Sequence, residues 1–147
     1  MSETIASIFE MIDMMIENAT IDYDALQEKV IDASFFADYN NTRIVNSFLF
    51  NFSKLQDKIG AKLFKTVLYE LKEIDSYSLT MIDVLHKLEA LEILDTTESW
   101  DRLREVRNIL AHEYPFDVEE RIENIDLAME GFVILQKIYV RLKSKVQ

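Results

Sequence analysis

One short segment, residues 104–115, holds side chains whose types and spacing suit proton transfer beside a phosphate. The imidazole of His112, with an ordinary pKa of about 6.5, can accept or donate a proton at neutral pH. The planar guanidinium of Arg107 suits a phosphate that gains negative charge in a transition state. Two further polar side chains, Asn108 and Tyr114, stand beside this pair.

Helical geometry separates the two charged groups of this segment. At about 100° per residue, positions five apart in a helix point about 140° away from each other, as Arg107 and His112 would. Asn108 and His112 share a face, and so do Arg107 and Tyr114. Either the helix unwinds before Pro115, or a second protomer completes the pair across a two-fold interface. Asn108 would then form a hydrogen bond with His112 or with the backbone and fix the orientation of the imidazole.

The segment from Arg107 to Tyr114 reads Arg-Asn-Ile-Leu-Ala-His-Glu-Tyr. It resembles the Arg-x4-His-x-Tyr motif of HEPN domains of the HepT toxin type. The resemblance implies a helical bundle of about this length, with the motif at the end of the penultimate helix. It also implies a metal-independent endoribonuclease toxin, active as a homodimer, in which the 2′-hydroxyl of the RNA is the nucleophile. Arg107 and His112 would be the catalytic residues.

The same resemblance implies a partner and a modification. A minimal nucleotidyltransferase, encoded beside such toxins, acts as antitoxin in a type VII-like toxin–antitoxin pair. It is expected to attach adenylate to the motif tyrosine (AMPylation), which is Tyr114 here. Two other interpretations stay open. One is a non-catalytic helical substrate-binding or partner subunit of a minimal nucleotidyltransferase. The other is a helical adaptor whose acidic first third binds a basic protein.

Other catalytic templates are missing from the sequence, which has no Gly-rich phosphate loop, nucleophile elbow or His-Glu-x-x-His string. The absence of cysteine excludes disulfides, thiolate metal sites and cysteine nucleophiles. His86 is the only other histidine, and we expect a partly exposed, structural role for it. We therefore predict neither a metal nor a cofactor.

The elements that position the segment are expected to be helices. The chain has 147 residues, enough for one domain (1–147) with its own core, and it contains only 2 Gly and 1 Pro. Glycine and proline form many of the tight turns that connect strands, so their scarcity argues against a sheet. Short loops between amphipathic stretches predict an all-α, up-and-down antiparallel bundle of about five helices. The stretches lie at about residues 3–18 (capped by Ser2), 22–37, 44–71, 79–93, 97–112 and 117–144.

Charge and apolar side chains are unevenly distributed. The net charge is −11, and residues 1–41 hold nine acids and one base, whereas residues 42–75 hold six bases and four acids. Contacts between basic side chains and phosphates supply most of the non-specific affinity for nucleic acids. A strongly acidic chain is therefore a poor general nucleic-acid binder, and we expect any RNA to bind at a local site only. Phe35-Phe36 and Phe48-Leu49-Phe50 place apolar side chains on more than one helix face, which favours a dimer.

The sequence also predicts a location. No stretch approaches the roughly 20 consecutive apolar residues that a membrane-spanning helix needs. The first three residues, Met-Ser-Glu, lack the basic flank and apolar run of a signal peptide. We therefore expect no membrane association and a cytoplasmic location.

Overall fold

The computed structural model describes residues 4–111 and 117–147, and these residues contain helices, turns and no strand. The all-α class that the sequence predicts is therefore confirmed. A 3₁₀ helix at Ala33–Ala37 precedes α2, and a π turn at Ile59–Leu63 joins α2 to α3 without a break. The helices are α1 (Ile5–Gln27), α2 (Tyr39–Lys58), α3 (Phe64–Glu70), α4 (Met81–Ala90), α5 (Thr97–Ala111) and α6 (Val118–Val146).

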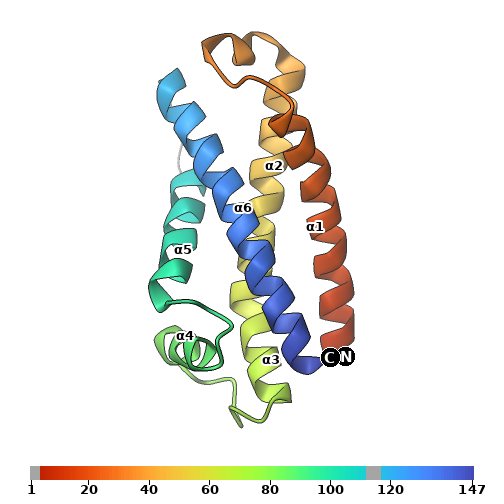
Figure 1. Cartoon of the computed structure of the whole chain (residues 1–147), viewed down its shortest axis with the longest axis vertical. Coiled ribbons are helices and arrows are strands. Elements are labelled where there is room, and N and C mark those ends of the chain that lie inside the picture. The colour runs from red at the N-terminus through yellow and green to blue at the C-terminus, as the bar shows by residue number, and fades with distance from the viewer. Residues whose placement is uncertain (1–3, 112–116) are drawn as a thin grey trace.

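The long helices form an up-and-down antiparallel bundle. Figure 1 shows α1, α2, α5 and α6 running along the long axis of the molecule, with successive helices pointing in opposite directions. The continuous rod of α2 and α3 spans its full length, α4 lies across the end where α3 finishes, and the first turn of α1 and the last turn of α6 lie together near that end. Within the described ranges, no helix is long and apolar enough to cross a membrane.

The core is one continuous cluster of apolar side chains contributed by all the helices. At its centre the rings of Phe48 in α2 and Phe132 in α6 meet edge to face, with their centroids 5.6 Å apart. The Tyr139 hydroxyl of α6 donates a hydrogen bond to Asp13 of α1 at 2.7 Å and lies 3.0 Å from the backbone oxygen of Phe9. Burial, and then Asp13, raises the pKa of Tyr139 well above its ordinary value, so this hydroxyl stays a donor.

The prediction of separate helices at residues 3–18 and 22–37 is wrong, because α1 runs unbroken from Ile5 to Gln27. Asp22 suggested a helix start, since aspartate is a common N-cap. In the fold its side chain instead accepts a hydrogen bond from the Ser47 hydroxyl of α2 at 2.6 Å, so it lies mid-helix and joins α1 to α2.

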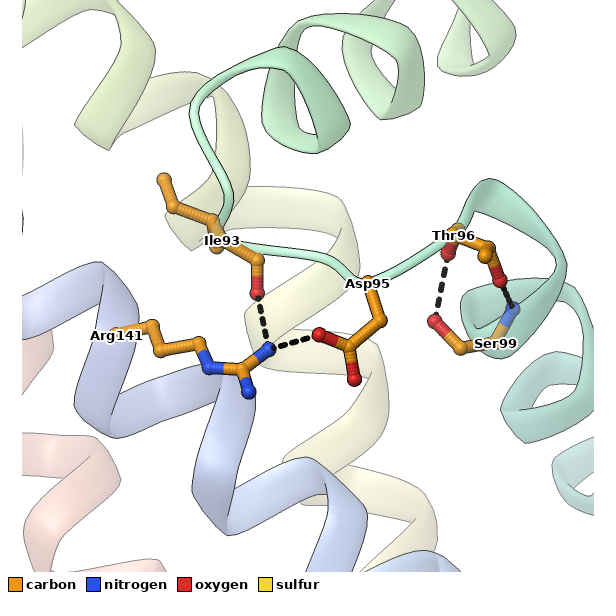
Figure 2. Close-up of polar contacts among 5 residues, drawn as sticks. All are labelled: Ile93, Asp95, Thr96, Ser99 and Arg141. Carbon is orange, nitrogen blue, oxygen red and sulfur yellow. Dashed lines mark hydrogen bonds and ion pairs between the residues drawn. The ribbon is translucent and has the colours of Figure 1, made fainter.

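The N-cap of α1 differs from the sequence prediction, and a second cap stands at the start of α5. The N-cap of α1 is Thr4, whose hydroxyl accepts from the backbone N–H of Ser7 at 3.1 Å. The predicted cap, Ser2, lies outside the described residues. At the start of α5, Ser99 donates its backbone N–H to the Thr96 hydroxyl at 3.2 Å and its own hydroxyl to the Thr96 carbonyl at 2.6 Å (Figure 2). Each cap satisfies backbone groups that the first turn of a helix leaves unpaired.

Contacts from two other helices hold the start of α5 in place. Arg141 of α6 donates to the Asp95 carboxylate at 2.9 Å and to the carbonyl of Ile93 at 3.4 Å, as Figure 2 shows. The backbone N–H of Thr97 donates to the Glu89 carboxylate of α4 at 2.8 Å. These bonds fix the start of the helix whose far end carries the Arg-x4-His segment.

Both glycines of the chain lie where a side chain from another helix meets a helix backbone. Trp100 of α5 is 1% exposed, and a Cβ atom at Gly60 would fall 2.5 Å from its ring. A Cβ atom at Gly131 of α6 would lie 3.0 Å from Phe52 and 3.2 Å from Leu103. The absence of side chains at these positions lets α5 and α2 approach the neighbouring backbones closely.

We predict that Gly60→Ala destabilises the protein. Forcing a methyl group against the buried Trp100 ring should cost about 1–3 kcal/mol, partly offset by a gain of about 1 kcal/mol in helix propensity. Gly131→Ala is the matched control, because its neighbours need to move less. Urea unfolding of both variants measures the difference. A Gly60→Ala variant as stable as Gly131→Ala would contradict the packing described here.

Candidate functional site

Arg107 lies near the end of α5 and is held by a carboxylate of α2. Its Nε and Nη2 atoms each donate a hydrogen bond of 3.0 Å to Asp57, one to each carboxylate oxygen. The exposed fraction of the side chain is 29% for Arg107 and 47% for Asp57. A two-bond pair of this kind fixes the plane of the guanidinium as well as its position. Nothing in the sequence pattern marks Asp57 as part of the site.

The pair leaves Arg107 charged and able to bind a second acceptor. The hydrogen bond with Asp57, opposed by partial burial, raises the pKa of Arg107 above its ordinary value. Asp57 engages two of the guanidinium N–H groups, and the others can still serve another acceptor such as a phosphate oxygen. The geometry therefore suits a pre-oriented anion-binding group rather than a flexible surface arginine.

Arg107 and Asp57 lie at the edge of a surface hollow of about 340 Å³ between α2 and α5. Phe50 is one of the residues that line this hollow, and its side chain is 62% exposed. The Lys54 ammonium lies 5.5 Å from the centroid of the Phe50 ring. The hollow thus combines two cations, an aromatic ring and uncharged polar groups. Its remaining lining residues are Asn46, Leu49, Ser53 and Leu110.

The other residues of the predicted site are only partly described. Asn108 is exposed on α5, next to Arg107. His112 and Tyr114 lie outside the described residues, so the expected contact between Asn108 and His112, and the role of Tyr114, stay predictions. His86 is exposed on α4.

A second hollow, of about 330 Å³, lies on another side of α5, against α6. It is largely apolar, and two of its lining side chains, Ile109 and Ile134, are 37% and 42% exposed. Adjacent exposed apolar side chains of this kind commonly mark a contact surface. The hollow is completed by Ser99, Arg102, Leu103, Glu105, Val106, Leu127, Glu130 and Gly131.

The fold and these side chains define a class: an all-α bundle with an oriented arginine beside a polar hollow. No family model, curated protein or solved structure matches this chain. In the parts of the chain that the structure describes, no group of three or more His, Cys, Asp or Glu side chains is placed to hold a metal ion.

We predict that Asp57→Asn loosens Arg107 without unfolding the protein. Surface ion pairs contribute only about 0–1 kcal/mol, so the urea midpoint should change little. The Arg107 Nε–H signal in a ¹H–¹⁵N spectrum should shift and broaden, because its acceptor is weakened. Asp13→Asn, which weakens the 3.0 Å pair with Lys143 between α1 and α6, is the control. An Arg107 signal that stays the same in Asp57→Asn would refute the orienting role of Asp57.

Proposed function

We propose that this protein is a HEPN-type, metal-independent endoribonuclease toxin of a type VII-like toxin–antitoxin pair. One observation carries the proposal: Arg107, the first residue of the Arg-x4-His string, is oriented by Asp57 at the edge of a polar hollow. A guanidinium held in one plane beside a hollow is arranged to receive an anion such as a phosphate. The resemblance of the 107–114 segment to HepT toxins supplies the reaction.

The proposed reaction uses the nucleophile that RNA carries. His112 takes the proton of a 2′-hydroxyl as its oxygen bonds to the adjacent phosphorus. The bond from phosphorus to the 5′-oxygen breaks, and the imidazolium that His112 has become gives the leaving oxygen a proton. Arg107 stabilises the charge that gathers on the non-bridging oxygens. Asp57 acts as a positioning residue, because it holds the guanidinium in one plane before the substrate arrives.

The proposed active form is a homodimer. The apolar hollow between α5 and α6 supports this, since Ile109 and Ile134 would lose their exposure to water against a second copy. Ile109 belongs to the 107–112 segment itself, so a dimer formed there would bring the two Arg-x4-His segments near one another. The proposed partners are a minimal nucleotidyltransferase antitoxin and cytoplasmic RNA.

We predict that the purified protein cleaves RNA and that cleavage survives EDTA. Arg107→Ala and His112→Ala should each lower the cleavage rate by about 100-fold or more. Circular dichroism should show both variants fully helical. In cells, induced wild type should arrest growth and degrade RNA, whereas His112→Ala should not. Undiminished cleavage by either variant, or loss in EDTA that a divalent ion restores, would count against the mechanism.

Mixing the two inactive variants tests whether the site is shared between protomers. If the working pair takes Arg107 from one copy and His112 from the other, a mixed dimer keeps one of its two sites. Equal mixing then restores about a quarter of wild-type activity, because half of the dimers are mixed. No restoration after full subunit exchange would mean that each protomer carries its own site.

We predict that Tyr114→Phe keeps nuclease activity and escapes silencing. An adenylate on the tyrosine hydroxyl would bring bulk and negative charge beside the guanidinium of Arg107 and block the phosphate. Incubation with a minimal nucleotidyltransferase and ATP, followed by intact-mass measurement, detects the added group in wild type but not in Tyr114→Phe. If wild type is left unmodified, or is modified yet cuts at its original rate, the partner-subunit interpretation takes precedence.

A further inference from the structure

The charge of α2 differs from that of the chain as a whole. The protein carries 27 acids and 16 bases. Helix α2 has three bases, Arg43, Lys54 and Lys58, and a single acid, Asp57. Both oxygens of that acid are bonded to Arg107 of α5. In an otherwise acidic protein, α2 therefore presents a local positive surface, and this surface leads directly to Arg107.

Five exposed side chains of α2 form one stripe. Arg43, Ser47, Phe50, Lys54 and Asp57 follow one another at intervals of three or four residues and are all exposed. This spacing places them along one side of the helix. At a rise of about 1.5 Å per residue the stripe is about 21 Å long. The opposite side of α2 packs into the core through Val45, Phe48, Phe52 and Leu55.

Phe50 is the central member of this stripe, and its position is unusual for a phenylalanine. The ring is 62% exposed, although the core lies on the other side of the same helix. It lines the hollow that also holds Arg107, and the Lys54 ammonium stands 5.5 Å from its centroid. An exposed ring beside cations is the arrangement with which proteins stack bases of single strands, and each stacked base contributes about 1–3 kcal/mol.

We propose that this face of α2, from Arg43 to Asp57, is a binding track for single-stranded RNA. An unpaired base stacks on Phe50, Lys54 contacts the neighbouring phosphate, and the strand continues to Arg107. A duplex is excluded because its base faces are already covered by stacking, which leaves the Phe50 ring without a base to stack on. Asp22 of α1, bonded to Ser47, forms the acidic border of the track. This inference deepens the proposed function by naming the form of its substrate.

The test is direct binding of a fluorescently labelled, single-stranded 2′-O-methyl oligonucleotide, which the protein cannot cleave, measured by anisotropy. Phe50→Ala should weaken binding by about 5- to 150-fold, the equivalent of one lost stacked base, whereas Phe50→Trp should retain it. Lys54→Ala should weaken binding and lower the slope of log affinity against log salt by about one. Tyr69→Ala is the matched control, because it removes an aromatic ring that is 49% exposed on α3 and should have no effect.

The binding and cleavage measurements distinguish failure of the proposed binding track from failure of the proposed nuclease function. Equal binding by wild type and Phe50→Ala, equal affinity for a duplex, or no binding by wild type would each overturn the track. If wild type and Phe50→Ala cleave RNA with the same KM, the binding track is overturned but the proposed nuclease activity stands. If binding of the single strand depends on Phe50 but the protein cleaves no RNA, the binding track is supported and the proposed nuclease function is rejected.

Discussion

The contact of Trp100 with Gly60 sets the position of α5, and the site depends on that position. The Trp100 ring is buried against the Gly60 backbone and meets the Phe64 ring edge to face, with centroids 4.5 Å apart. Arg107 follows Trp100 by seven residues, so both side chains leave nearly the same side of the helix. Packing Trp100 against the rod of α2 and α3 therefore also turns Arg107 toward α2, where Asp57 receives it.

Screening explains how a protein of net charge −11 can still offer a local site to an anion. At physiological ionic strength, exposed charges more than about 8 Å apart interact weakly. Acids farther than this from the hollow therefore contribute less to its potential than Lys54 and Arg107, which line it. The acid nearest to Arg107, Asp57, is engaged by it in two hydrogen bonds. The local arrangement, rather than the net charge, decides what this face can bind.

Helix interiors were easier to predict from the sequence than helix ends. The apolar stripe predicted over residues 44–71 falls within the continuous rod of α2 and α3, because periodicity reports directly which side of a helix is buried. The helix ends depend on local backbone geometry that has no clear signature here. Lys72 and Glu92 adopt the left-handed conformation just after α3 and α4, with φ angles of 60° and 61°. Glycine normally marks such positions, and without it the stretch predicted over 79–93 runs past the end of α4 at Ala90.

The sequence by itself determined the all-α class and the candidate chemistry of the 107–114 segment, because composition, apolar period and a short motif are local properties. It did not identify the partner of Arg107. Asp57 stands 50 residues away along the chain, exposed on a helix where nothing in the pattern distinguishes it from a solvated carboxylate. The same holds for the hollow around Phe50, which exists only because α5 packs beside α2. Tertiary packing decides which exposed side chains become neighbours, since hydrophobic periodicity specifies only the buried faces.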